Sequence, residues 1–272
     1  MSKDISRLVD GWPYEPGEVR ARWIEADDGS RKLQLRLDLG IFQMEPTGRP
    51  DGTCPRGAIS LRDFYIEEEM RSPDEKLPYK LDNDACAELQ LEAMQYYYRI
   101  MAFYALGEHK SVVKDCEHNL DIIDIVSDYA ADDETAWQFN QLFPYMRMML
   151  ARAVAEVAMS RDRFDRAARA VKDGIRQIEQ FFAENYEPQN ADGTPAPPPA
   201  EVISLRELLA DIERRRPKSE AENLRAELAR AVELENYEKA AFLRDQLKRL
   251  QGLATRPPDK KRSRSESKEN RS

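Results

Sequence analysis

Few residues of this chain have the types and spacing that catalysis or metal binding requires. The two histidines, His109 and His118, fall in one helical stretch, with Cys116 seven residues after the first and Asp115 three residues before the second. A dinuclear carboxylate site needs a second acidic–histidine pair of that spacing, and a zinc site needs three or four convergent ligands. The sequence also lacks the GxSxG, GxGxxG and GxxxxGK(S/T) motifs. We therefore expect no metal site, no cofactor and no enzymatic activity.

The same stretch carries carboxylates whose spacing places them on one helix face. They are separated by four, three and four residues, and like charges at this spacing cost about 0.2–0.5 kcal/mol per pair. Two interpretations stay open. The face is either solvated, or it is a groove for a basic peptide or partner, with Arg147 and Arg152 as internal counter-charges. The residues of this acidic face are Glu117, Asp121, Asp124 and Asp128.

Charge is distributed unevenly along the 272 residues, whose formal net charge is −9. Residues 256–272 hold seven basic and three acidic side chains, so this tail carries +4 and the preceding 255 residues carry −13. An acidic body repels nucleic-acid phosphates, whereas the tail is either a solubilising end or a weak nucleic-acid contact. No apolar window of membrane-spanning length, no apolar leader and no CxxC occur. These features predict a cytoplasmic protein without a membrane span.

The hydrophobic pattern predicts an α+β fold that is mostly α and that begins with a small N-terminal domain over residues 1–83. A strand is expected over Val19–Ala26, followed by a turn, and Lys32–Met44 alternates between apolar and polar residues as a half-buried strand does. Gly40 marks a bend in it. Leu61–Arg71 is a short helix. The buried strand face is expected to hold Leu33, Leu35, Leu37, Leu39 and Ile41.

Residues 84–185 are expected to form an antiparallel helical array. Two stretches, Ala105–Asp115 and Met159–Arg169, each join helices by a short polar turn. The array is therefore similar to tetratricopeptide (TPR) hairpins, although an ordinary antiparallel bundle explains the pattern as well. Pro144 predicts a helix break just before it. Helices are expected over Ala85–Leu106, Ser111–Tyr129, Ala151–Met159 and Arg163–Glu184, with Asp132–Glu134 opening a further one and with Leu89, Met94, Tyr97, Met101 and Tyr104 inward in the first.

The C-terminal third divides into a proline-rich linker over 186–200, a connecting helix over 201–217, a helical hairpin over 218–252 and a disordered basic tail over 253–272. A capping box at Ser219–Glu222 opens the hairpin, and Gly252 is expected to end it. Two helices joined by so short a turn must lie antiparallel. Their apolar stripes are Leu224, Leu228, Ala231 and Val232 on the first helix and Ala240, Ala241, Leu243, Leu247 and Leu250 on the second.

This hairpin resembles the UVR motif family, also called the UvrB/UvrC motif. The resemblance covers roughly 35 residues and lies mainly in the run Tyr-Glu-x-Ala-Ala-x-Leu-Arg-Asp, which is matched without a gap. The residues that carry it are Leu224, Leu228, Ala231, Asn236, Tyr237, Glu238, Ala240, Ala241, Leu243, Arg244 and Asp245.

The resemblance implies a bacterial docking hairpin. The family's hairpins occur in the excinuclease subunits UvrB and UvrC, in Clp ATPases and in an activator of protein-arginine kinase. It implies as partner another UVR-bearing protein of the excinuclease or the Clp and arginine-kinase type, or a second copy of this chain. The chain lacks the P-loop and the paired CxxC motifs of those proteins.

We expect a non-enzymatic adaptor or regulatory protein that docks a partner through the hairpin. One alternative is an accessory factor of nucleotide-excision DNA repair that interacts with UvrB/UvrC-type subunits, and a second is a hydrolase in the N-terminal domain. Arg244 and Asp245 are neighbours that point about 100° apart, so we expect them not to pair. The predicted partner-binding residues are Leu228, Tyr237, Glu238, Ala241, Arg244, Asp245 and Lys248.

Overall fold

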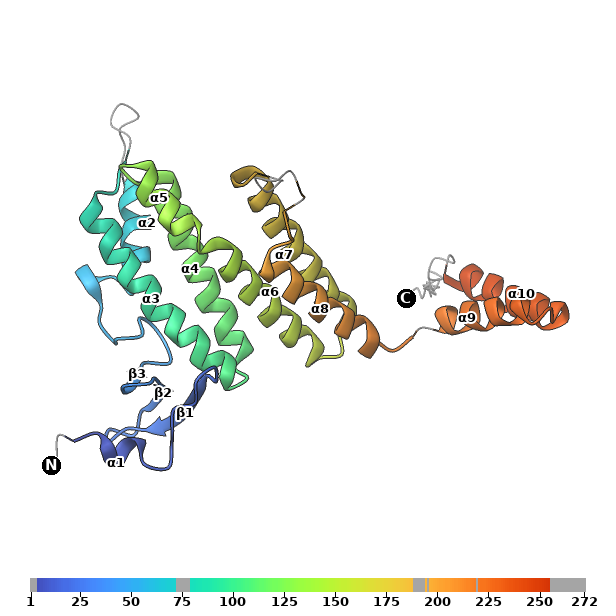
Figure 1. Ribbon diagram of the computed structural model, residues 1–272, viewed down its shortest axis with the longest axis horizontal. Helices are drawn as coiled ribbons and strands as arrows, with labels where there is room; N and C mark the ends of the chain where they lie inside the picture. The colour runs from blue at the N-terminus through green and yellow to red at the C-terminus, as the bar shows by residue number, and fades with distance from the viewer. Residues whose placement is uncertain (1–3, 72–78, 188–193, 195, 219, 255–272) are drawn as a thin grey trace, which may run out of the picture. The chain divides into compact units, whose positions relative to one another are not determined.

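The computed structural model describes residues 4–71, 79–187, 194, 196–218 and 220–254. The chain separates into two compact units, Met1–Arg215 and Arg216–Ser272. The first unit combines a three-stranded sheet with an array of helices (Figure 1), which confirms the predicted α+β, mostly α class. Within the described ranges, every helix is too short or too polar to cross a bilayer.

The sheet is an antiparallel meander preceded by the one-turn helix α1 (Ser6–Val9). Strands β1 (Arg20–Glu25) and β2 (Arg31–Arg36) pair with Trp23 opposite Leu33. The prediction of one strand through Lys32–Met44 is wrong, because the chain reverses and returns as β3 (Ile41–Met44).

The reversal is a tight turn closed by hydrogen bonds between the backbones of Leu37 and Gly40. Leu39 lies at the tip of this turn and is 91% exposed, whereas Leu33 and Leu35 are buried as predicted. The alternation of apolar and polar residues in the sequence therefore runs on through residues that form a turn and not a strand.

The helical part of the first unit begins as the sequence predicts. Helix α2 (Leu61–Arg71) has the expected bounds and follows the short 3-10 helix η1 (Pro55–Gly57). Asp82 and Asp132 cap α3 and α5 through their side chains, and Pro144 lies in the first turn of α6. The long helices pack in chain order, each against the next (Figure 1). They are α3 (Asn83–Ala105), α4 (His109–Tyr129), α6 (Phe143–Met159), α7 (Phe164–Asn185) and α8 (Ala200–Arg215). The short helix α5 (Asp133–Asn140) packs against α4.

The buried face of α3 differs from the predicted one. Leu89 is fully buried, but Met94 is 47% exposed, and Tyr97, Met101 and Tyr104 are only partly buried. The reason is that α3 packs against α4 on one side and against β1, β2 and α2 on others. Because α3 contacts several elements, its buried residues include Tyr96, Ile100 and Phe103 in place of most of the predicted ones.

Helix α8 is part of the first unit, although the sequence set it apart as a connecting helix. Val202, Leu205 and Ile212 are fully buried against α6 and α7. Gly174 of α7 permits this close packing, because a Cβ atom there would lie 2.7 Å from the Cβ of Ala151 in α6. The predicted linker over 186–200 lies partly outside the described residues.

The second unit holds helices α9 (Glu220–Glu233) and α10 (Tyr237–Ala254), which form the predicted hairpin (Figure 1). Helix α10 continues two residues beyond Gly252, so the prediction that this glycine ends the helix is wrong. Ser219 of the predicted capping box and residues 255–272 of the predicted tail lie outside the described residues.

Three helix pairs are joined by turns of the same backbone geometry: α3–α4, α6–α7 and α9–α10. In each turn one residue has positive φ, namely Gly107 at 72°, Asp162 at 55° and Glu235 at 53°. Its N–H and the next N–H bond back to carbonyls of the preceding helix, as in a Schellman motif. The two stretches that resemble each other in sequence are therefore two of these turns, and the third belongs to the hairpin. The TPR likeness of the array stays a prediction.

Candidate functional site

The seam of the α9–α10 hairpin is narrow. Ala231 of α9 faces Ala240 and Leu243 of α10, all three buried, with Leu224 and Leu228 half-buried beside them. Alanines at this contact let the two helices approach closely. The seam thus uses the predicted stripe but only part of it.

Two residues predicted for the seam lie outside it. Val232 is 51% exposed, and Ala241 is exposed although Ala240 beside it is buried. Successive helical residues point about 100° apart, so a one-residue-wide seam admits only one of two neighbours. For this reason the prediction that both Ala231 and Val232, and both Ala240 and Ala241, lie in the seam is wrong.

The outer surface of the hairpin carries large apolar side chains. Leu234 lies in the turn, Tyr237 begins α10 and Phe242 follows one and a half turns later. Their exposed fractions are 71%, 68% and 62%. Together with Val232 they are the set of exposed apolar side chains that we call the apolar patch of the hairpin, although Tyr237 and Phe242, five residues apart, point about 140° apart on α10. Exposed apolar groups of this size mark interaction surfaces more often than ordinary surface does.

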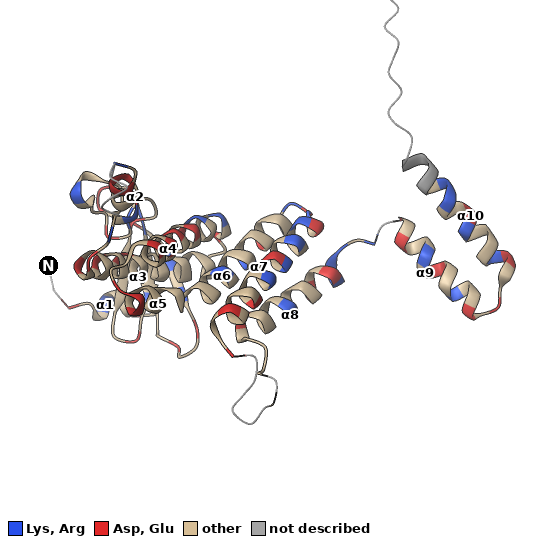
Figure 2. Ribbon diagram, turned by 90° about the horizontal axis from the view of Figure 1, so that it is seen from above, with Lys and Arg blue, Asp and Glu red and all other residues tan. Residues whose placement is uncertain are grey.

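Charged side chains of both signs surround these apolar residues on α9 and α10 (Figure 2). The predicted docking residues Glu238, Lys248 and Ala241 are exposed. Arg244 and Asp245 are exposed too, but they form an ion pair at 3.1 Å, so the prediction that they do not pair is wrong. The long arginine side chain can curl across the angle that separates the two Cα–Cβ bonds.

The hairpin turn is fixed locally. The side-chain oxygen of Asn236 accepts a hydrogen bond from the backbone N–H of Lys239 at 3.1 Å, so it caps the N-terminus of α10. The backbone N–H of Asn236 itself bonds to the carbonyl of Ala231 at 2.8 Å. These contacts fix the start of α10, with Tyr237 at its first position.

An antiparallel helix pair with a thin alanine seam and exposed apolar side chains defines a small helical module. Comparison with protein families identifies it further: residues 218–253 match the UvrB/uvrC motif (UVR) family. That motif is a helical element associated with protein–protein contacts and DNA repair. Searches of curated proteins and of solved structures gave no match. The match covers the hairpin and leaves the first unit without an assigned family.

The acidic face of α4 forms an ion pair with a residue that the sequence analysis did not single out. Arg62 of α2 forms an ion pair with Asp121 at 3.0 Å, whereas Arg147 bonds to Gln177, and Arg152 to Tyr104 and Ser204. Among the described residues neither arginine forms an ion pair with this face, but the charge of Arg147 acts to lower the pKa of Asp124, as expected of an internal counter-charge.

Electrostatic coupling within the acidic face is visible at Asp124. Burial, together with the neighbouring carboxylates of Asp121 and Asp128, raises the pKa of the Asp124 carboxyl. Glu117, Asp124 and Asp128 are all exposed, so the face is mainly solvated.

A buried charge cluster lies between α3 and α4, formed by Glu92, Arg99, Asp115 and His118. Arg99 donates two hydrogen bonds of 2.8 Å to the carboxylate of Asp115, and both side chains are almost fully buried. Glu92 accepts bonds from the backbone N–H groups of Leu61 and Arg62 at 2.8 and 3.1 Å, and lies 3.0 Å from the Nε2 of His118. The cluster therefore joins α2, α3 and α4.

The pKa shifts agree with an ionised Glu92 beside a neutral His118. Burial acts to raise the pKa of Glu92, but the hydrogen bonds from His118 and the two backbone amides outweigh it, so the pKa is lowered. Burial also lowers the pKa of His118, against the opposing bond to Glu92. Burial raises the pKa of Asp115, and Arg99 opposes that shift.

The cluster also fixes the loop that leaves the sheet. Arg99 donates to the carbonyl oxygens of Glu45 and Gly48 at 3.0 and 2.7 Å, and the ring of Tyr96 stacks on His118 at 3.5 Å. A cavity of about 450 Å³ lies beside it, lined by both charge signs. Within the described part of the chain, no group of three or more His, Cys, Asp or Glu residues could hold a metal ion.

Sequence reasoning missed Glu92 and Arg99. The available signal was their spacing, because Leu89, Glu92, Tyr96, Arg99 and Phe103 follow each other at intervals of three and four. Charged residues at the period of a helix core face must be buried with partners.

Proposed function

We propose that this protein docks a protein partner through the α9–α10 hairpin and acts as a non-enzymatic adaptor or regulatory protein. The observation that carries the proposal is Phe242. It is 62% exposed at the sixth position of α10. The sixth positions of α4 and α7, which follow turns of the same geometry, hold Lys114 and Arg169, both exposed. A phenyl ring replaces a solvated cation at this position, so the surface suits an apolar contact.

The remaining patch residues support the same reading. Aromatic residues dominate the energy of protein contacts, and Tyr237 and Phe242 lie within one helix. Charges around the patch, with Arg244 and Asp245 among them, would set the choice of partner through complementarity. The partner implied by the motif is another UVR-bearing protein, of the excinuclease or the Clp and arginine-kinase type, or a second copy of this chain.

The test measures binding of the full chain to two synthetic UVR hairpins, one of excinuclease type and one of Clp type, and self-association by sedimentation. The double variant Tyr237→Ser/Phe242→Ser should weaken the observed interaction at least about tenfold, because truncated aromatic hot spots cost about 2 kcal/mol or more. Circular dichroism should stay unchanged, since both residues are exposed. The matched control Glu227→Ser, at an exposed position of α9 outside the predicted docking residues, should bind as the wild type does. Equal binding by the double variant would exclude this face.

The two hairpins also separate the alternative functions. Binding to the excinuclease-type hairpin alone would favour an accessory role in DNA repair, and binding to the Clp-type hairpin alone would favour an adaptor role in the stress response. A hydrolase in the N-terminal domain stays a prediction that this experiment does not address.

A further inference from the structure

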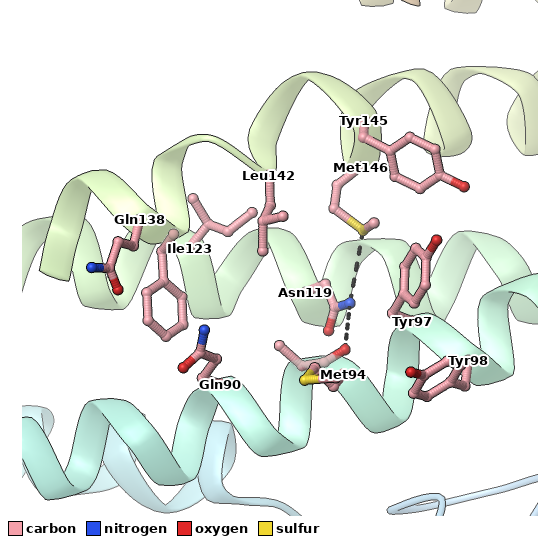
Figure 3. A pocket seen from close by; sticks show the side chains of 12 residues that line it. Gln90, Met94, Tyr97, Tyr98, Asn119, Ile123, Gln138, Leu142, Tyr145 and Met146 are labelled. Carbon is pink, nitrogen blue, oxygen red and sulfur yellow. Dashed lines mark hydrogen bonds between the residues drawn. The ribbon is translucent and has the colours of Figure 1, made fainter.

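The first unit contains an apolar pocket that the hairpin does not involve. It has a volume of about 410 Å³ and lies between α3, α4, α5 and α6 (Figure 3). Volumes of this size accommodate small organic molecules. All of the described residues that line it are uncharged, in a chain of which 34% is charged. Met94 and Leu142 are each 47% exposed, so the apolar lining reaches the surface.

One polar group in the lining lacks a partner. The Oδ1 atom of Asn119 is buried and accepts no hydrogen bond from the described residues. The Nδ2 atom of the same side chain donates to the carbonyl of Ala93 at 3.0 Å and lies 3.7 Å from the sulfur of Met146 (Figure 3). Because turning the amide would break this donation inside the core, Oδ1 keeps its direction.

We propose that this pocket binds a neutral, mainly apolar molecule of one or two rings that donates one hydrogen bond to Asn119 Oδ1. A buried acceptor without a donor is unfavourable, and a ligand N–H or O–H would satisfy it. Oδ1 is closed to solvent in the structure. Met94 also lines the pocket (Figure 3) and follows Ala93, whose carbonyl accepts from Asn119, and its unbranched side chain can rotate to open a path to this atom. A charged ligand is disfavoured because the pocket offers no counter-charge among its described residues.

The test is a titration of the full chain with indole and with 1-methylindole, followed by ligand-observed NMR. The two probes share their ring system, but only indole carries an N–H donor. Indole should bind in the millimolar range or tighter, and 1-methylindole should bind about three to ten times more weakly, which is the net effect of one hydrogen bond. Equal affinities would overturn the role of Asn119.

Two variants locate the site. Leu142→Trp fills the mouth from an exposed position and should weaken indole binding at least tenfold, whereas Ile203→Trp, which is 44% exposed on α8, should have no effect. Asn119→Leu should remove the preference for indole over 1-methylindole if the variant keeps the wild-type tryptophan emission. Absence of indole binding to the wild type, or binding that Leu142→Trp leaves unchanged, would overturn the proposal. Binding of a protein partner to the hairpin is unaffected by any of these outcomes.

Discussion

The α6–α7 and α9–α10 helix pairs share one turn and differ in what covers them. Both turns are Schellman motifs, at Asp162 and Glu235, and the fourth residue of each second helix, Ala167 or Ala240, is buried against the first helix. In the first unit, α8 covers the pair and buries Val171 and Ile178 with it. In the second unit, Tyr237 and Phe242 stay exposed.

The difference shows that the same kind of helix pair, joined by the same turn, occurs in two different environments. A covered pair is a structural repeat whose apolar residues stabilise the unit. A pair that keeps its apolar residues outside is poorly stabilised by its own seam and is suited to bind something else. The four predictions that follow test this contrast, beginning with the largest expected effect.

Breaking the buried ion pair should destabilise the first unit and leave the hairpin intact. Arg99→Leu strands the Asp115 carboxylate and should lower the free energy of unfolding by about 3–5 kcal/mol. Urea unfolding followed by tryptophan emission measures it, because Trp12, Trp23 and Trp137 all lie in the first unit. The double variant Arg99→Leu/Asp115→Leu should recover much of the loss. A loss of hydrogen-exchange protection in α9 and α10 would show that the units are coupled.

The converse prediction concerns the seam. Ala240→Arg should unfold the hairpin, with a cost above about 2 kcal/mol, because it places a charge and extra volume at a buried contact. Ala241→Arg, one residue further along and exposed, should leave it folded. Hydrogen exchange of α9 and α10 distinguishes the two, while the tryptophan-monitored transition stays the same for both. Equal protection in the two variants would contradict the observed seam.

The third prediction tests the rim of the apolar patch. Arg244→Glu sets two carboxylates side by side, at the place of the present 3.1 Å ion pair, and should weaken partner binding or self-association by about 1 kcal/mol or more with little loss of helicity. The swap Arg244→Glu/Asp245→Arg keeps the pair but reverses its direction. If the swap restores binding, the pair matters through its own geometry; if it does not, Arg244 meets the partner. Wild-type binding by Arg244→Glu would remove this rim from the interface.

The smallest effect is expected from acidification. Because the pKa of His118 is lowered in the folded state, the unfolded chain binds more protons below its own pKa of about 6.5, and stability falls as the pH falls through that value. From pH 7 to 5.5 the loss for this group is at most about 1.2 kcal/mol. His118→Gln should reduce the slope of stability against pH in that window. His118 also contributes to the pKa values of Glu92 and Asp115, so the difference between the two proteins reports His118 together with its effect on these two carboxyls.

The sequence determined the local structure of this protein. The period of the apolar residues predicted α3, α4 and α7 to within two residues at each end, Asp132–Glu134 and Pro144 indicated where α5 and α6 begin, and the run Tyr237–Asp245 indicated the hairpin and its motif. The expected helix Ala151–Met159 was only the second half of α6. These signals are readable because each arises from neighbours within two turns of chain.

Only the tertiary structure decided which faces are buried and which charges meet. Leu39 fits a strand pattern but lies in a turn, and Arg62 reaches Asp121 from a helix 59 residues away. Glu92 and His118, 26 residues apart, become partners only because α3 packs on α4. Likewise, nothing local leaves Asn119 Oδ1 without a donor. Burial depends on elements that are distant in sequence. Whether a given residue is buried or exposed is therefore decided by how those elements pack, and not by the type of the residue alone.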